Sequence, residues 1–318
     1  MRSASIADFT PRLLEFLDSS PTPFHAVASL VRRLDDSGFT RLEDAQSWDL
    51  RPGKGYYLVR NGSAIVAFKL GTQALLESGI RVAGAHTDSP CLKLKPAPVL
   101  RRKNYLQLGV EVYGGALLNP WFDRDLSLAG RVDFVAGSGA LDSALIDVRK
   151  PIATIPSLAI HLDRTANEGR KINPQTEMAP IVLQAGAEEE FSFDAYLQQQ
   201  LAADGIEAQQ ILAHELMLYD TQPASLVGMR EEFLASARLD NLLSCFLACE
   251  ALIAAPDEHT SLVVCNDHEE VGSVSSSGAQ GPFWKAGAEG RLSAQPGEPA
   301  GFARAMSCAS RLRIDNRP

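Results

Sequence analysis

The sequence has no excess of positive charge. Lys and Arg number 30 against 39 Asp and Glu, which gives a formal net charge of -9 at pH 7. A nucleic-acid binder needs a basic surface to neutralise phosphates, and no run reaches the roughly 18 continuous apolar residues of a membrane helix. We therefore expect neither nucleic acid nor a membrane among the partners of this chain.

Cysteine is scarce, and its spacing excludes two kinds of site. The odd number of cysteines, five, argues against a disulfide framework. The absence of a C-x-x-C pair argues against a thiolate zinc site. Cys245 and Cys249 are four apart in an apolar helical pattern, which is typical of core packing. Residues 1–18 carry acidic side chains and lack the apolar region of a signal peptide. We expect a reducing, cytoplasmic location.

Several common catalytic motifs are also missing. His268 to Gly272 reads H-E-E-V-G, so the second histidine of the H-E-x-x-H zinc motif is replaced by glycine. There is no G-x-S-x-G elbow and no phosphate-binding G-x-x-x-x-G-K-[ST] loop. These absences argue against a zincin, a serine hydrolase of the elbow type and a P-loop nucleotidase.

The chain of 318 residues is long enough for two ordinary domains, or for one large domain with an insertion. Thr22 followed by Pro23 predicts the start of an amphipathic helix that ends near Gly38. Strands are predicted over 56–60, 64–70 and 80–85.

A different pattern fills residues 96–230, where short β-like runs alternate with turns rich in Gly, Pro and Asn. This pattern predicts a mostly β insertion, with strands at 106–113, 131–135, 158–162 and 180–183. After residue 230 a long apolar helix (239–255) and a buried strand (261–265) follow. The predicted domains are 1–94 and 235–318, which form one α/β domain, and the insertion 95–234.

Three polar clusters lie at the ends of apolar runs. They contain His86 with Asp88, then Asp240, then Glu269 with Glu270. In an open α/β sheet, ligands bind where strands end and helices begin, so these segments can converge on one crevice.

Imidazole and carboxylates are ligands of zinc and also suit cobalt or manganese. Asp240 could bridge two ions, and one of the two adjacent glutamates could bind metal while the other accepts a proton. Asp88 could orient the His86 ring. Taken singly, His86 could be structural, Asp240 a helix N-cap and the glutamates a solvated turn, so the pattern alone leaves both interpretations open.

The segments 83–90, 236–241 and 267–273 resemble the metal motifs of the aspartyl aminopeptidases, which are two-metal zinc aminopeptidases. Further similar segments are 114–115 through 123–126, 160–164 and 173–178. The motifs agree in order from about residue 8 to about residue 306.

The resemblance implies a role for each residue. His86 would bind one metal ion, Asp240 would bridge two, and Glu270 would bind the other. Glu269 would be the general base, and Asp88 would orient His86. The cofactors would be two divalent ions, zinc first, with cobalt or manganese as alternatives.

The resemblance also implies an architecture and a substrate. The fold would be a mixed-sheet α/β metallopeptidase domain with an inserted, mostly β dimerisation domain. Dimers would assemble into a dodecamer, in which His161 reaches a neighbouring subunit's active site and helps to hold substrate. The substrate would be a peptide with an N-terminal Asp or Glu.

The end of the chain departs from this family. The family continues past Pro318, and the apolar run that should end in a metal-binding aspartate is here rich in arginine, with Asp315 near the expected place. The final histidine ligand and the residues that select an acidic side chain are absent. We therefore expect a truncated chain with impaired or absent activity. The alternatives are a non-catalytic relative that only oligomerises and a two-metal aminopeptidase of broader specificity.

Overall fold

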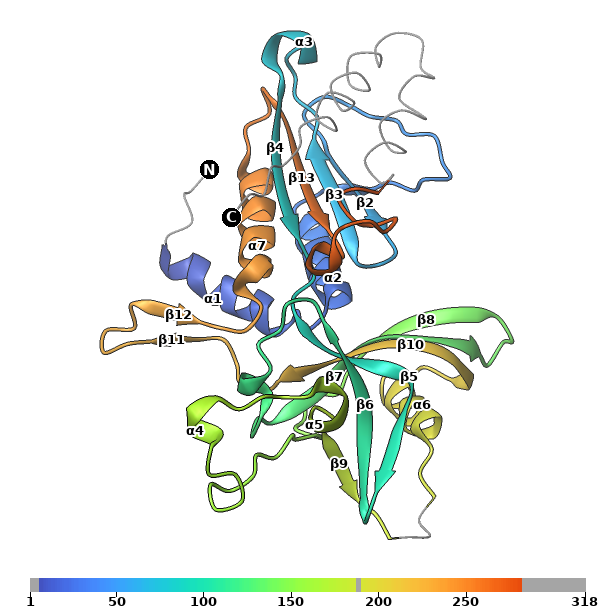
Figure 1. Cartoon of the computed structure of the whole chain (residues 1–318). Helices are drawn as coiled ribbons and strands as arrows, with labels where there is room; N and C mark the ends of the chain where they lie inside the picture. Colours follow the sequence, from blue (N-terminus) through green and yellow to red (C-terminus); the bar gives the residue numbers. More distant parts are fainter. Residues whose placement is uncertain (1–5, 187–189, 282–318) are drawn as a thin grey trace. The chain divides into compact units, whose positions relative to one another are not determined.

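The computed structural model describes residues 6–186 and 190–281, and it divides into two compact units (Figure 1). Unit 1 combines Met1–Ser89 with Arg238–Pro318, and unit 2 is Pro90–Ala237. The chain therefore leaves unit 1 and later returns to it. The domain boundaries predicted from the sequence lie at 94/95 and 234/235.

Unit 1 is an α/β unit. Its elements in chain order are α1 (Ile6–Asp18), α2 (Pro23–Asp36), β1 (Thr40–Arg41), β2 (Gly55–Arg60), β3 (Ala64–Lys69), α3 (Leu75–Ser78), β4 (Ile80–His86), α7 (Leu239–Ala254), β13 (Thr260–Asn266) and the 3-10 turn η2 (Glu269–Val271).

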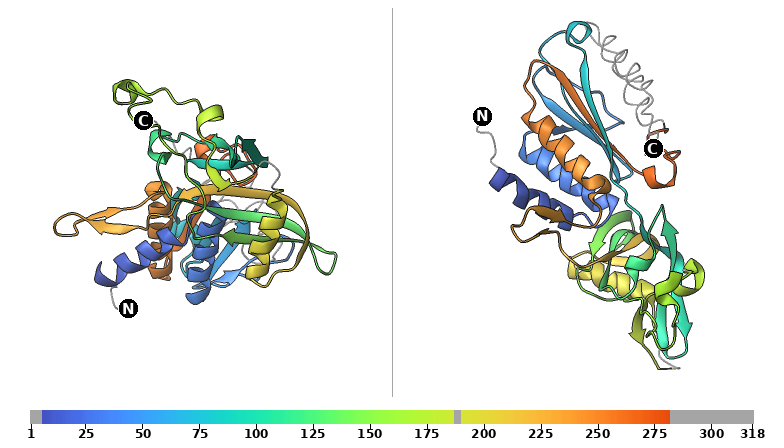
Figure 2. Two further views of the ribbon diagram at one scale, coloured as in Figure 1. Left: turned by 90° about the horizontal axis from the view of Figure 1, so that it is seen from below. Right: turned by 60° about the vertical axis from the view of Figure 1, so that its left-hand side comes forward.

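The sheet of unit 1 is mixed and has the strand order β1-β2-β3-β13-β4. β13 runs parallel to β4 and antiparallel to β3. Helices α2 and α7 pack beside each other against this sheet, and α1 packs against α7 (Figure 2). β4 is exposed over most of its length, but β3 and β13 are buried on both faces along their whole lengths. That accounts for the unbroken apolar runs in their sequences.

The start of α2 follows the predicted capping pattern. The backbone N–H of His25 donates to the Thr22 hydroxyl, and Pro23 occupies the first turn. The helix ends at Asp36, and Gly38 adopts the positive φ of 79° that glycine tolerates best. A local signal in the sequence thus fixes both ends of this helix.

Unit 2 is built on an antiparallel sheet with the order β8-β7-β10-β5-β6-β9. Its elements are β5 (Cys91–Arg102), β6 (Tyr105–Tyr113), η1 (Asn119–Trp121), β7 (Leu126–Ala136), β8 (Leu141–Asp147), α4 (Ala166–Gly169), α5 (Pro174–Glu177), β9 (Ile181–Gln184), α6 (Phe193–Ala203), β10 (Ala208–Asp220), β11 (Ser225–Val227) and β12 (Phe233–Ala235).

Helix α6 covers part of this sheet and was not predicted. Ser192 caps it by accepting the N–H of Ala195. Leu197 and Leu201 lie four residues apart on its buried side, in the same apolar core as Phe134 of β7. This single apolar stripe is what holds the helix on the sheet.

One predicted strand is wrong. Residues 158–162 form no strand, and their backbone turns, with the N–H of Leu162 donating to the carbonyl of Ala159. The alternating Leu158, Ile160 and Leu162 are all exposed, so alternation here does not mark one buried face.

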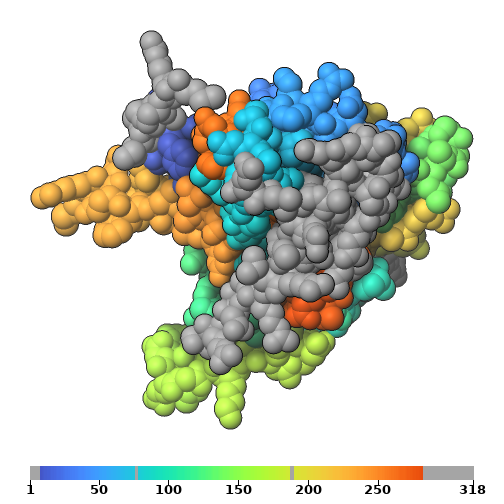
Figure 3. Space-filling model, turned by 90° about the horizontal axis from the view of Figure 1, so that it is seen from above, coloured from blue at the N-terminus to red at the C-terminus, as the bar shows by residue number. Residues whose placement is uncertain are grey.

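Unit 2 also carries an exposed hairpin of β11 and β12, which pair antiparallel (yellow-orange in Figure 3). Met229 and Phe233 are exposed in it.

Cys91, Cys245, Cys249 and Cys265 are buried. Within the described part of the chain, no helix combines the length and apolarity needed to cross a membrane.

Candidate metal centre

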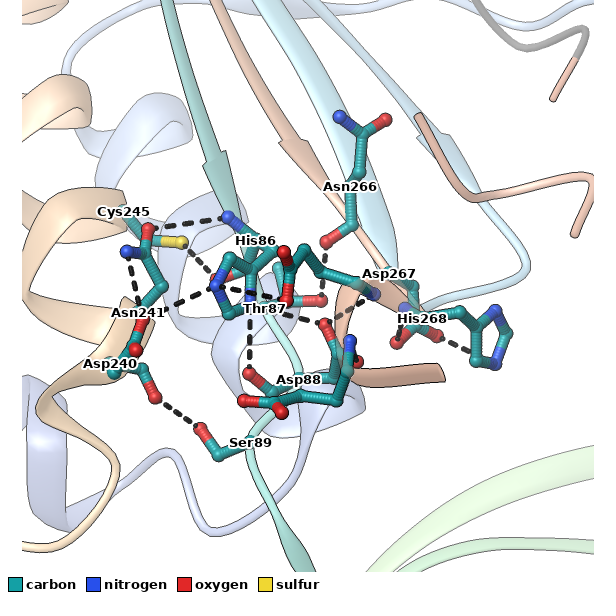
Figure 4. Close-up of polar contacts among 12 residues, drawn as sticks. His86, Thr87, Asp88, Ser89, Asp240, Asn241, Cys245, Asn266, Asp267 and His268 are labelled. Carbon is teal, nitrogen blue, oxygen red and sulfur yellow. Dashed lines mark hydrogen bonds and ion pairs between the residues drawn. The ribbon is translucent and has the colours of Figure 1, made fainter. Parts of the chain in front are cut away.

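The parallel pairing of β4 with β13 brings two of the polar clusters together. His86, the last residue of β4, lies opposite Asn266, the last residue of β13. The backbone N–H of Thr87 donates to the carbonyl of Asn266 at 2.8 Å. The segments that follow the two strands therefore leave the sheet at the same edge, and the start of α7 faces them (Figure 4).

The His86 imidazole is held between carboxylates. Its Nδ1 lies 3.1 Å from the carbonyl oxygen of Asp88 and 3.3 Å from Oδ1 of the same residue. Its Nε2 lies 3.3 Å from Oδ1 of Asp240 and 3.9 Å from Oε2 of Glu269. Because both atoms near Nδ1 are acceptors, we infer that Nδ1 carries a proton, whereas Nε2 faces two carboxylates that would hold either a second proton or a metal ion at this nitrogen.

Asp88 links two of the clusters. Its carboxylate accepts the backbone N–H of Glu269 through Oδ1 at 3.2 Å and that of Glu270 through Oδ2 at 3.1 Å. Asp88 is 0% exposed, so these charge-assisted hydrogen bonds form away from water. One buried carboxylate therefore fixes both the His86 ring and the turn that carries the two glutamates.

Negative charge is concentrated around this imidazole. Burial would lower the pKa of His86, but the hydrogen bond and charge of Asp88, with the charges of Glu269 and Asp240, outweigh it and raise the pKa. Burial and the charge of Asp88 raise the pKa of Glu270. Both raised pKa values reflect an excess of negative charge at this site. A bound divalent cation would offset that charge.

Asp240 is not the N-cap of its helix. The cap position is Arg238, which has left-handed backbone angles and no capping side chain. Asp240 and Asn241 follow with non-helical angles, joined by a cis peptide bond. The Asp240 side chain is 79% exposed, and the hydroxyl of Ser89 donates to its backbone carbonyl at 2.8 Å. The carboxylate is therefore aimed at His86 and accessible to a ligand.

The pair of His86 and Asp240 fits a zinc ion. Two ligands of a tetrahedral zinc ion, each about 2.0–2.1 Å from it, are about 3.3 Å apart. Nε2 of His86 and Oδ1 of Asp240 have a separation of 3.3 Å. Within residues 6–186 and 190–281, no group of three or more His, Cys, Asp or Glu is arranged to hold a metal ion. Asp315 lies outside the described residues, so the structure does not place this predicted ligand.

The sequence missed two contacts that hold His86. Its backbone N–H donates to Oδ1 of Asn241 at 3.4 Å, and the Cys245 thiol donates to its carbonyl at 3.1 Å. The neighbouring Cys265 thiol and burial raise the pKa of Cys245, and burial raises that of Cys249 to about 12. Both thiols are therefore protonated at neutral pH. The sequence feature that could have predicted these two contacts is the pair of polar side chains four residues apart at the start of an apolar helix.

The turn after β13 contains a second buried acid. The backbone N–H of His268 donates to Oδ1 of Asp267 at 2.7 Å, and Nδ1 of His268 lies 2.7 Å from the Ser275 hydroxyl. Burial raises the pKa of Asp267. These contacts fold the segment back on itself and support the adjacent glutamates. His161 lies in unit 2, exposed in the turn that replaces the wrongly predicted strand.

Comparison with known sequences gives consistent matches. The family model described as "Aminopeptidase I zinc metalloprotease (M18)" matches residues 16–312. The chain is 58% identical over 272 residues to the "Probable M18 family aminopeptidase 2" of Pseudomonas putida, which covers 85% of this chain and 63% of that protein. A protein of the same name from Pseudomonas aeruginosa is 55% identical over 278 residues, or 87% of this chain and 65% of its own. The chain thus spans less than two thirds of the length of these relatives.

Solved structures give similar matches. A cryo-EM structure of the Ape4 and Nbr1 complex matches with a TM-score of 0.84 and 36% identity, over 91% of this chain and 60% of that one. The mApe1 of Chaetomium thermophilum matches with a TM-score of 0.82 and 32% identity, over 95% and 69%. The mApe1 dodecamer of Saccharomyces cerevisiae matches with a TM-score of 0.78 and 28% identity, over 92% and 68%.

Proposed function

The chain belongs to the aminopeptidase I zinc metalloprotease (M18) family, and we propose that it is a metal-dependent aminopeptidase that removes N-terminal Asp or Glu from peptides. The observation that carries this proposal is the approach of Nε2 of His86 to Oδ1 of Asp240 at 3.3 Å, with the Glu269–Glu270 turn fixed beside them by Asp88. This constellation has the donors of a metallohydrolase and a spare carboxylate for proton transfer.

In this proposal His86, Asp240 and Glu270 hold two divalent ions, with zinc favoured and cobalt or manganese as alternatives. Asp315 is proposed as a further ligand. When bound, such ions polarise the substrate carbonyl and ease the deprotonation of water.

The protein's own residues then orient the reactants and move the proton. Glu269 is the general base: its carboxylate accepts a proton from the attacking water and passes it to the amine that leaves when the first peptide bond breaks. Its side chain is 40% exposed and lies beside His86, so water and substrate can reach it. Asp88 is a positioning residue, because it binds the backbone of Glu269 rather than the reactants.

We also propose a homo-oligomer. The yeast mApe1 that this chain resembles is described as a dodecamer, and we assign dimerisation to unit 2, with dimers assembling further. His161, exposed in unit 2, would contact substrate bound to a neighbouring subunit. An imidazole on the surface can reach another chain, which a buried one could not.

Hydrolysis of a matched set of peptides tests the proposal. Peptides that differ only in an N-terminal Asp, Glu, Asn or Leu are incubated with the zinc-loaded chain, and with the chain stripped by a chelator and then reloaded. We expect faster release of Asp and Glu than of Asn and Leu, loss of activity on stripping, and recovery with zinc. Equal rates for all four would support broader specificity instead. Zinc binding by a folded oligomer without turnover would support a non-catalytic scaffold.

A further inference from the structure

Helix α7 holds the main chain of His86 at two points. Asn241 accepts the His86 N–H at 3.4 Å, and the Cys245 thiol donates to the His86 carbonyl at 3.1 Å (Figure 4). Asn241 precedes Cys245 by four residues and lies in the non-helical segment at the start of α7. This end of α7 therefore contacts both polar main-chain groups of a single residue.

These two groups of His86 face away from the neighbouring strand. The N–H of Thr87 pairs with β13, and successive backbone groups point to opposite sides of a strand. The N–H and carbonyl of His86 therefore point away from β13. β4 is the last strand of its sheet within the described residues, so α7 provides here what another strand would provide elsewhere.

We propose that Cys245 is a positioning residue of the metal centre: its thiol fixes the His86 carbonyl, and through it the direction of the imidazole toward Asp240. This inference rests on the proposed function, because it takes His86 and Asp240 as metal ligands. Cys245 would touch neither metal nor substrate.

The surrounding contacts show why the position of one carbonyl matters. Asp240 lies in the non-helical segment that leads into the regular part of α7, five residues before Cys245, so a bond from Cys245 to His86 constrains the gap between the end of β4 and that segment. Ser89 ties the other side by donating to the backbone of Asp240. Without the thiol, the His86 main chain loses one of its ties, and the 3.3 Å separation from Asp240 is free to vary.

Cys249 offers a matched control. It lies one further turn along α7 and is 3% exposed where Cys245 is 0%. Replacing either cysteine removes a buried, protonated thiol from the same region. Only the Cys245 sulfur bonds to the carbonyl of His86 among the contacts that the described residues make.

The experiment compares Cys245→Ala, Cys245→Ser, Cys249→Ala and His86→Ala in the full 318-residue chain. The dissociation constant of zinc is measured by competition with a chromophoric chelator, and the stability of the metal-free proteins by urea unfolding. We expect Cys245→Ala to weaken zinc binding about 10-fold or more, as loss of a group supporting a ligand does. Cys245→Ser keeps a donor and should recover most of the affinity. Cys249→Ala should leave zinc affinity unchanged even where it lowers stability.

Equal zinc affinity in Cys245→Ala and Cys249→Ala would overturn the inference while leaving the metal site in place. Zinc binding that His86→Ala does not alter would overturn the proposed function and this inference together. The His86 variant therefore separates the two failures. If Cys245→Ala does not fold, Cys245→Val replaces it in the comparison. Equal zinc affinity in folded Cys245→Ser and Cys245→Val would then contradict the role of the hydrogen-bond donor.

Discussion

Nε2 of His86 and Oδ1 of Asp240 lie 3.3 Å apart, although one residue ends β4 and the other begins α7. An imidazole nitrogen and a carboxylate oxygen at this distance can share a proton or a metal cation. Their separation matches two ligands of one tetrahedral ion. This contact joins segments that lie on either side of the whole of unit 2 in the sequence.

Replacement of the general base should separate chemistry from binding. Glu269→Gln keeps the shape of the side chain but cannot accept a proton. We expect kcat for a peptide with N-terminal Asp to fall by about 10²- to 10⁴-fold, with zinc content unchanged. Glu258→Gln, at an exposed position, is the control and should retain wild-type kcat. Loss of zinc in Glu269→Gln would contradict its role as a base alone.

Asp88→Asn should affect both stability and metal binding. The new amide group would confront the N–H of Glu269 or Glu270 inside the protein. We expect a loss of about 2–4 kcal/mol in the free energy of unfolding, measured by urea denaturation of the metal-free chain. Zinc affinity should also fall, by about 10- to 100-fold. The exposed Asp36→Asn should change neither quantity, and a matching loss in that variant would point to a general effect of charge.

Glu250 ties α7 to two other helices. Its carboxylate binds Arg12 of α1 and Arg33 of α2, and the Arg33 guanidinium lies 4.7 Å from the centre of the Phe246 ring. Glu250→Gln leaves both guanidinium groups without an anion, so unfolding should become easier by about 1–3 kcal/mol.

The exposed pair of Arg51 and Asp49 serves as the comparison for Glu250. Because exposed ion pairs contribute little, Asp49→Asn should cost less than about 0.5 kcal/mol. Thermal or urea unfolding measures both variants. Equal costs would show that partial burial adds nothing to the Glu250 cluster.

His214 should make unit 2 sensitive to acid. It lies on β10 with its ring edge-on to Phe193, and burial lowers its pKa, with the Pro96 carbonyl and Asp194 acting in the opposite direction. The unfolded chain then takes up a proton near pH 6.5 while the folded chain does not. Stability should therefore fall as pH drops below about 6.5 and level off below the depressed folded pKa.

His214→Phe removes this titration and keeps a ring. Its unfolding free energy should depend less on pH than that of the wild type between about pH 7 and pH 5, measured by urea denaturation. His161→Phe, at an exposed position, should keep the wild-type slope. An unchanged slope in His214→Phe would show that other groups cause the acid sensitivity.

Much of unit 1 could be predicted because its signals are local. Thr22, Pro23 and Gly38 mark a helix by their own conformational preferences, and the unbroken apolar run of β13 requires burial on both faces. Asp240 was harder, since the same residue type begins many helices as an N-cap. Its non-helical backbone depends on contacts with segments far away in the sequence.

Contacts to main-chain atoms could not be predicted from the sequence. No residue pattern shows that Asp88 would accept the amides of Glu269 and Glu270, or that Cys245 would bind a carbonyl, because backbone groups have no sequence signature. The false strand at 158–162 has a related cause: alternating apolar residues indicate a strand only where a partner strand lies beside them. Helix α6 was missed because Gly- and Pro-rich turns around it suggested a uniform β region.

Zinc content tests the central claim most directly. The wild-type chain, His86→Ala, Asp240→Ala and the control His161→Ala are loaded with zinc, dialysed against metal-free buffer and analysed for zinc per folded chain. We predict that the wild type and His161→Ala retain zinc. His86→Ala and Asp240→Ala should lose it, because each of these two variants lacks one of the proposed metal ligands. Equal retention of zinc by His86→Ala and the wild type would contradict the metal centre described above.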